Sequence, residues 1–230
     1  MLKQKIWLWE YVKVSIIGAG NGGCATAVDL TLKGFDVTLC SAYAPNHILP
    51  LINKGGLEYS GGLGEGFVNL RATIDIKQAV EDAQIILIVA PSPFHETYAR
   101  ILAPLLTGKQ IPIALSGSST GGPLHAYKIL KDMRVSEPII GETDILPYAA
   151  RLVSQTQLKI FHKVKWRLFS CFPSQHSSDL YTDMRSIYPE LELADNVLQT
   201  SLSNINAILH PPGMILNAGW IESTGGDFLF

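Results

Sequence analysis

The feature that most constrains this chain is a glycine-rich turn directly after its first predicted strand. A β-branched run at residues 12–17 leads into Gly18-Ala19-Gly20-Asn21-Gly22-Gly23, and small residues continue to a second predicted strand at 36–40. In such a βαβ unit, the first glycine permits the tight turn and the second lets the backbone approach a pyrophosphate, while the third lets helix and strand pack closely. The alternative is a turn without a ligand. We expect a dinucleotide to bind Gly18, Gly20, Asn21, Gly22 and Gly23.

Strands and helices alternate through most of the chain. Apolar strand-length runs at 85–90, 111–115 and 138–141 are separated by helical segments, among them 95–106 and a helix that begins near Pro123. This alternation predicts an α/β fold, a Rossmann-type doubly wound parallel sheet, over residues 1–195. Lysine and aromatic residues alternate from Leu158 to Phe172, which predicts a hairpin appended to that sheet.

Two positions at predicted strand ends bear on the choice of cofactor. Ser41 occupies the place where an acidic residue normally binds the ribose 2′-hydroxyl of NAD. Without that carboxylate a 2′-phosphate is not repelled, although no arginine follows to bind it, so NADP is slightly favoured over NAD. Pro91 follows the predicted strand at 85–90 and either packs on the cofactor or simply ends the strand.

Charge and cysteine content exclude several classes of protein. Charged residues make up 17% of the chain, the net charge is −2, and the pI is about 6.3, which argues against binding to nucleic acid. The three cysteines have no motif spacing, which indicates reduced thiols and a cytoplasmic location. The histidines lack metal-ligand spacing, and we expect no metal site.

The C-terminal segment has an unusual composition. Residues 196–221 contain no Lys, Arg, Asp or Glu, but nine polar side chains and two prolines argue against a membrane span. We expect 196–230 to form the first helices of an all-α second domain. At helical spacing, Leu198, Leu202, Ile205 and Leu209 form an apolar stripe, beside a polar stripe of Gln199, Ser203, Asn206 and His210. Exposed apolar side chains here would favour self-association.

His210 is the titratable residue that the sequence singles out. Pro211 disfavours helical backbone at His210, so we expect the helix to end there and the prolines to open a second helix. An imidazole in a cleft suits general acid–base chemistry, with Asn206 one turn earlier to orient it. The alternative is a hydrogen-bonded structural histidine.

Two segments resemble octopine/nopaline-type opine dehydrogenases. They are Gly141-Glu142-Thr143-Asp144-Ile145-Leu146-Pro147-Tyr148-Ala149-Ala150-Arg151, and the stretch from Asn204 through His210-Pro211-Pro212-Gly213 to Glu222. The resemblance implies an NAD(P)H-dependent condensation of an amino acid with a 2-keto acid, two small-molecule substrates. It implies that His210 polarises or protonates the keto-acid oxygen and that Thr143 and the loop containing Ser118 contact the keto acid. From its place on the polar stripe, we expect Asn206 at the substrate as well.

The resemblance also implies a larger helical domain than the chain contains. The sequence stops at Phe230, inside what resembles a continuing motif, so we expect a truncated C-terminal domain. Two alternatives stay open. One is a different NAD(P)-dependent reductase of 2-keto or hydroxy acids with a helical second domain, and the other is an inactive nucleotide-binding fragment.

Overall fold

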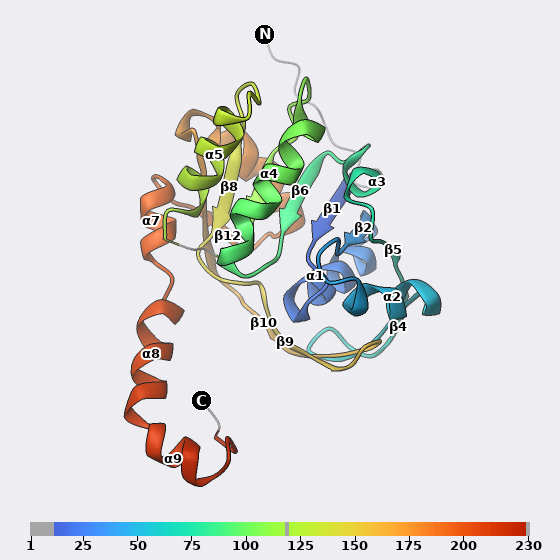
Figure 1. The fold of residues 1–230 in the computed structure, drawn as a ribbon, viewed down its shortest axis with the longest axis vertical. Coiled ribbons are helices and arrows are strands. Elements are labelled where there is room, and N and C mark those ends of the chain that lie inside the picture. The colour runs from blue at the N-terminus through green and yellow to red at the C-terminus, as the bar shows by residue number, and fades with distance from the viewer. Residues whose placement is uncertain (1–11, 118–119, 229–230) are drawn as a thin grey trace.

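The main body is an eight-stranded sheet with helices on both faces (Figure 1). The computed structural model describes residues 12–117 and 120–228. The strand order is β12-β11-β8-β7-β6-β1-β2-β5, and all neighbours are parallel except β8 and β11. The strands are β1 (Lys13–Ile17), β2 (Asp36–Cys40), β5 (Arg71–Thr73), β6 (Ile85–Ile88), β7 (Ile113–Leu115), β8 (Ile140–Thr143), β11 (Arg167–Phe172) and β12 (Leu191–Leu193).

Two apolar clusters, one on each face, hold the helices to this sheet. The first cluster joins the sheet to α1 (Asn21–Leu32), α2 (Pro45–Lys54) and α6 (Ser177–Ile187). The second joins it to α3 (Ile76–Val80), α4 (His95–Leu106) and α5 (Gly122–Asp132). The strands alternate with helices that cover opposite faces, which confirms the predicted doubly wound α/β fold.

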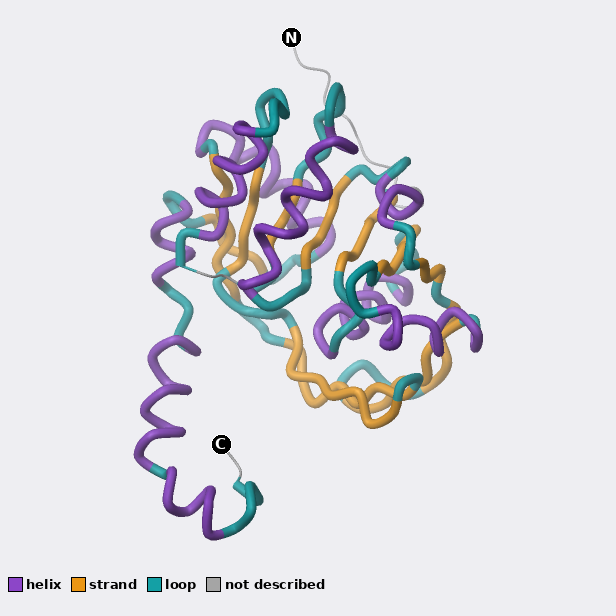
Figure 2. The backbone as a smooth tube through the Cα atoms, viewed as in Figure 1, coloured by secondary structure: helices purple, strands orange, loops and turns teal. Residues whose placement is uncertain are grey.

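A smaller sheet lies beside α1, below the main sheet in Figure 2. Its order is β4-β3-β10-β9, with β3 (Gly56–Gly61), β4 (Gly66–Asn69), β9 (Tyr148–Ser154) and β10 (Gln157–Lys163). The predicted hairpin across 158–172 is wrong, because β10 pairs with β9 and β3, whereas β11 joins the main sheet. Residues 167–171 are buried throughout, as the interior of a large sheet requires. The alternation of lysine and aromatic residues along the chain does not specify which strand pairs with which.

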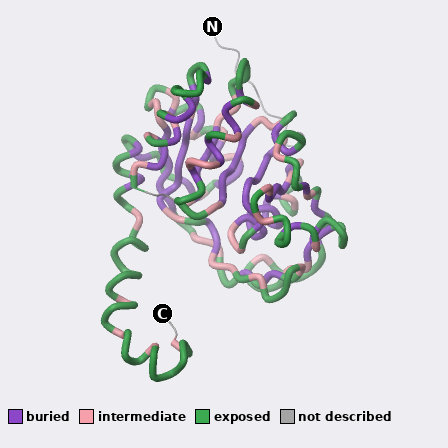
Figure 3. Tube along the Cα trace, in the orientation of Figure 1, coloured by how far each residue is buried: buried purple, intermediate pink, exposed green. Residues whose placement is uncertain are grey.

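Three helices form the C-terminal segment. They are α7 (Val197–Leu202), α8 (Asn206–Leu216) and α9 (Ala218–Ser223). Val197, Thr200 and Ser201 are buried and hold α7 against β8 and β11, where Thr200 hydrogen-bonds to Ser170. Beyond α7 the chain leaves the body of the protein, and α8 and α9 are largely exposed (Figure 3).

The polar and apolar stripes expected on one continuous helix are divided between α7 and α8. Asn196 caps α7, its side chain accepting hydrogen bonds from the backbone N–H groups of residues 198 and 199. At the other end of α7, Ser203 donates its hydroxyl to the Gln199 carbonyl, and Asn204 Oδ1 accepts the Asn206 N–H at 3.0 Å. These side chains compete with the helical backbone bonds, which accounts for the break between the two helices.

The prediction that Pro211 ends the helix at His210 is wrong. Helix α8 runs through His210, Pro211 and Pro212 to Leu216. Each proline removes one helical N–H donor, and because the surrounding residues are exposed, water can replace the lost bonds. No helix in the described parts of the chain is long and apolar enough to cross a membrane.

Candidate functional site

The glycine turn has the close contacts that its sequence predicted. Gly18 has a φ of +117° and its N–H donates to the Cys40 carbonyl at 2.8 Å. A Cβ at Gly18 would lie 2.2 Å from the Val89 carbonyl oxygen, and a Cβ at Gly23 would lie 1.7 Å from that of Gly18. No side chain fits at either position, so the two glycines bring β1, β6 and α1 into direct backbone contact.

Gly20 differs from its neighbours because open space surrounds it. A Cβ built there would meet no atom within 4 Å, although the residue caps the N-terminus of α1. No side chain of a described residue caps this helix, and its first turn contains no acidic residue. The first-turn N–H groups and the helix dipole are therefore arranged to receive an anion.

A cleft of about 430 Å³ opens in front of Gly20, where β1, β6, β7 and β8 end. In an open α/β sheet this edge is where ligands bind. The cleft brings together five residues predicted for the site: Gly20, Asn21, Gly22, Pro91 and Asn206. It also includes residues that the sequence reasoning missed, namely Val89, Ala90, Ser92, Ser116, Gly117, Ile145, Leu146 and Asn204. Most of these follow directly on strand ends, which was the signal available for finding them.

Asn21 links the turn to the smaller sheet. Its side-chain Oδ1 accepts the backbone N–H of Leu152, in β9, at 2.8 Å. This bond ties the first residue of α1 to β9, so the side chain of a residue that lines the cleft has a structural partner. Asn21 therefore fixes the position of the turn relative to the second sheet.

Ser41 and Thr143 are nearly buried and lie outside the cleft lining. Ser41 is at the end of β2, and its hydroxyl donates to the Ala44 carbonyl at 3.2 Å. Thr143 Oγ1 accepts the Gly117 N–H at 3.1 Å and donates to the Ile145 carbonyl at 3.0 Å. Thr143 does not line the cleft itself. It stabilises the two cleft-lining segments that contain Gly117 and Ile145.

The loop that contains Ser118 is anchored on both sides. Ser118 itself lies outside the described residues. Before it, Gly117 is bonded to Thr143, and after it, the Gly121 N–H donates to Ser201 Oγ at 3.3 Å. Ser201 in turn donates to the buried Glu142 carboxylate at 2.6 Å. Helix α7 is thereby bonded to the same loop and strand that shape one side of the cleft.

His210 lies outside the cleft lining, on the exposed part of α8. It is four residues after Asn206, which does line the cleft. Residues four apart share one face of a helix, so His210 is on the face that Asn206 presents to the cleft, one turn farther from it.

A second histidine, His95, contacts the backbone of a residue that lines the cleft. His95 is 4% exposed, and its Nε2 lies 3.0 Å from the carbonyl oxygen of Ala90, a residue that lines the cleft. Burial lowers the pKa of His95, while the bond to Ala90 opposes the shift, so the ring is neutral at pH 7 and Nε2–H donates. This histidine was missed because nothing in its sequence surroundings marks it as buried.

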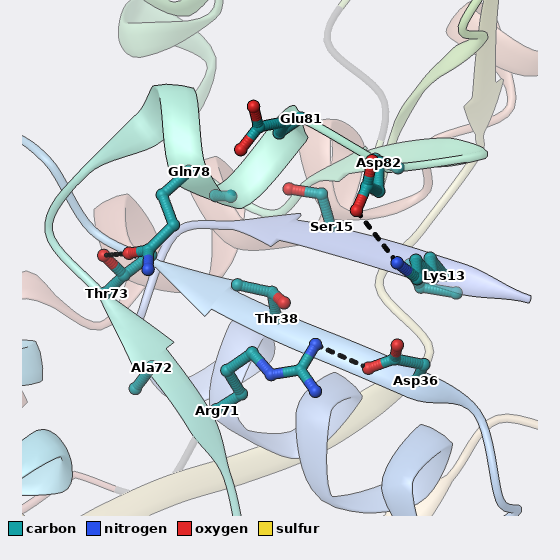
Figure 4. Close-up of a pocket in the computed structure, with 13 residues that line it drawn as sticks. Lys13, Ser15, Asp36, Thr38, Arg71, Ala72, Thr73, Gln78, Glu81 and Asp82 are labelled. Carbon is teal, nitrogen blue, oxygen red and sulfur yellow. Dashed lines mark hydrogen bonds and ion pairs between the residues drawn. The ribbon is translucent and has the colours of Figure 1, made fainter.

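Another cavity, of about 250 Å³, lies on the face of β1, β2 and β5 beside α3 (Figure 4). Four of its five charged residues form ion pairs, with Lys13 Nζ 3.0 Å from Asp82 and Arg71 Nη1 2.9 Å from Asp36. The fifth, Glu81, adds a negative charge that disfavours a phosphate, and the cavity contains no residue of the glycine turn, so we assign the nucleotide to the larger cleft.

The residues of the larger cleft fit a dinucleotide. None of the described residues that line it has a charged side chain, so nothing there repels a pyrophosphate. Ser116, at the end of β7, lines the cleft, and its buried Oγ has no hydrogen-bond partner among the described residues. The described residues contain no cluster of three or more potential metal ligands.

Comparisons with known proteins match both parts of the chain. Residues 13–133 match the family model for the N-terminus of NAD-dependent glycerol-3-phosphate dehydrogenase. Residues 193–230 match the family model for the alpha-helical domain of NAD/NADP octopine/nopaline dehydrogenase.

Curated relatives extend over nearly the whole chain. An opine dehydrogenase of Arthrobacter sp. (strain 1C) is 34% identical over 212 residues, which cover 91% of this chain and 58% of the relative. A vitopine synthase of Allorhizobium ampelinum is 27% identical over 216 residues, covering 92% of this chain and 59% of the relative. The chain therefore spans less than two thirds of the length of these relatives.

Solved structures share the fold. An octopine dehydrogenase structure with NADH and L-arginine superimposes with a TM-score of 0.73 at 19% identity, covering 88% of this chain and 53% of that one. A yersinopine dehydrogenase with NADP+ bound gives 0.71 at 16% identity, covering 90% and 53%. The match of the helical segment and the 34% identity over nearly the whole chain lead to one group, and the chain belongs to the NAD(P)-dependent opine dehydrogenase family of the octopine/nopaline type.

Proposed function

We propose that the protein carries out the NAD(P)H-dependent reductive condensation of an amino acid with a 2-keto acid. The observation that carries this proposal is the single cleft lined both by the open Gly20 and by the helical-segment residues Asn204 and Asn206. Family membership supports the chemistry. Related octopine dehydrogenase structures contain NADH with L-arginine, agmatine or pyruvate, which supports these substrate classes.

The reaction joins two small molecules and then reduces the product of their condensation. The amine of the amino acid adds to the keto carbon, and the keto oxygen departs as water to leave an imine. Reduction of the imine carbon would use a hydride that NAD(P)H supplies when bound, and a proton on nitrogen would complete the secondary amine. The net reaction consumes one NAD(P)H and one proton and releases one water.

His210 is proposed to act at the keto-acid oxygen. It polarises the carbonyl during amine addition and protonates the oxygen that leaves as water. Asn206, one turn earlier on the same helix face, orients the imidazole from the cleft. Thr143 and the loop that contains Ser118 are proposed to contact the keto acid, and the bonds of Thr143 to Gly117 and Ile145 would keep that wall in place.

The cofactor is proposed to lie across the strand ends with its pyrophosphate at the N-terminus of α1. Gly20, Asn21 and Gly22 would bind it through the backbone, and Pro91 would pack against it. Ser41, at the end of β2, would lie at the adenosine ribose, where the missing carboxylate slightly favours NADP over NAD.

The organisation of the chain is part of the proposal. Residues 1–195 would form the dinucleotide-binding domain and 196–230 the first part of a helical catalytic domain, whose exposed apolar face would favour self-association. A cytoplasmic location is proposed because all three cysteines are buried and free.

The test is amine dependence of NAD(P)H consumption. With a 2-keto acid and a panel of amino acids, we expect NAD(P)H oxidation to require both substrates. Consumption with the keto acid alone would instead identify a reductase of 2-keto acids. Tight nucleotide binding with no consumption under any substrate pair would identify a binding protein without turnover.

A further inference from the structure

Leu146 has a conspicuous position in the cleft. It follows β8 by three residues, lines the cleft and is 40% exposed, although it is a large apolar side chain. Its methyl groups lie 3.5 and 3.6 Å from a Cβ built on Gly22, and its Cγ lies 3.1 Å from a Cβ built on Gly117. The side chain therefore lies between the first turn of α1 and the loop after β7, in a space that two glycines leave free.

The cleft changes character along its length. At one end, the N-terminus of α1 at Gly20 attracts an anion. Beside it, after the ends of β6 and β8, the lining includes the apolar side chains of Val89, Pro91, Ile145 and Leu146. A ligand with a charged middle and an uncharged ring at one end would match this order.

The strand order indicates which end of a bound dinucleotide would lie at the apolar side chains of the cleft. The adenosine ribose belongs at the end of β2, on one side of β1. Leu146 follows β8, which lies beyond β6 and β7 on the opposite side of β1. The apolar end of the cleft is thus on the nicotinamide side of the glycine turn.

We infer that Leu146 is the apolar platform on which the nicotinamide ring packs, an inference that rests on the cofactor part of the proposed function. The ring would cover the exposed part of the leucine side chain, and both surfaces would be removed from water. The leucine is held most closely on the Gly117 side, where a Cβ would lie 3.1 Å from its Cγ, whereas on the Gly22 side a Cβ would be in ordinary van der Waals contact with its methyl groups.

The experiment separates the two ends of the cofactor. Binding of NADH and NADPH is measured by titration calorimetry, alongside ADP-ribose or its 2′-phosphate, which keep the pyrophosphate and lack the nicotinamide. For Leu146→Gln we expect roughly tenfold weaker binding of the preferred dinucleotide, since a half-exposed leucine loses its apolar contact. Binding of the matching ADP-ribose should stay within about twofold of wild type.

Two further variants keep the inference falsifiable. Leu146→Met preserves apolar volume and should retain dinucleotide affinity. Leu193→Gln is the matched control, because Leu193 is 44% exposed and lies on β12 at the far edge of the main sheet. Leu193→Gln should change neither the affinity for the dinucleotide nor that for ADP-ribose.

The outcomes distinguish this inference from the proposed function. Equal weakening of both ligands in Leu146→Gln would mean that the leucine only supports the turn, and unchanged binding of both would mean that the ring lies elsewhere. Either result overturns the inference and leaves the cofactor assignment standing. Failure of the wild-type protein to bind any of these ligands would overturn the cofactor assignment and the inference with it.

Discussion

Replacing Gly20 with valine separates nucleotide binding from folding. In the folded protein Gly20 has a φ of −81° and a ψ of −170°, a backbone conformation open to any residue, and a Cβ there meets nothing within 4 Å. Valine allows the unfolded chain fewer backbone conformations than glycine does, which should stabilise the folded variant by about 0.4–1 kcal/mol. Loss of a favoured N-cap residue should destabilise it by a similar amount, about 1 kcal/mol. The free energy of unfolding should therefore change by less than about 1 kcal/mol.

The effect on binding should be far larger. The new side chain fills the space in front of the first turn of α1, where the pyrophosphate must approach the backbone. We expect the Kd for NAD(P)H to rise at least roughly 100-fold, which corresponds to about 2.8 kcal/mol. Titration calorimetry measures the Kd, and urea denaturation measures the stability on the same samples.

Gly23→Ala is the matched control from the same turn. Its Cβ would lie 1.7 Å from the Gly18 carbonyl oxygen, so the backbone must move, and overpacking of this kind typically costs about 1–3 kcal/mol. This variant should lose stability, in contrast to Gly20→Val. Unchanged NAD(P)H affinity in a folded Gly20→Val protein would refute the reasoning, because the pyrophosphate would then not contact this turn.

Three other predictions follow from the described contacts. In the form of the protein that turns over, His210→Ala should lower amine-dependent turnover by about 10²–10⁴-fold with NAD(P)H affinity unchanged, whereas His125→Ala, an exposed histidine outside the cleft, should have no effect. Equal turnover in both variants would make His210 structural. Burial lowers the pKa of His95 in the folded protein. As the pH falls below about 6.5, the histidine is therefore protonated more readily in the unfolded chain than in the folded one, and the folded state loses stability. Urea midpoints at pH 7.5 and 5.5 should therefore fall more in wild type than in His95→Gln, and an identical fall would contradict this. Ile215 and Leu216 are 73% and 82% exposed, and changing both to Asp should reduce self-association in light scattering; a wild-type protein that is monomeric at all concentrations would refute that expectation.

The sequence predicted the glycine turn well because each glycine has a local physical reason. The backbone contacts at Gly18 and Gly23, and the open space at Gly20, were all expected from the spacing alone. The layered α/β architecture followed from the alternation of apolar strands and helices, a pattern that depends on neighbours along the chain.

Features that depend on distant parts of the chain were predicted less well. The strand partners of β10 are set by packing against α1 and β3, which alternation within residues 158–172 does not encode. The break between α7 and α8 depends on side-chain bonds of Ser203 and Asn204 that compete with the helix. The cleft residue Leu146 belonged to a quoted motif, but its contact with two glycines 124 and 29 positions away required the fold.

The identity of the reaction product tests the account most directly. NAD(P)H carrying deuterium at the transferred position of the nicotinamide ring is supplied with a 2-keto acid and an amino acid, and the products are analysed by mass spectrometry and NMR. We expect a secondary amine dicarboxylate with one deuterium on the former keto carbon. A deuterated 2-hydroxy acid formed without incorporation of the amino acid would contradict it.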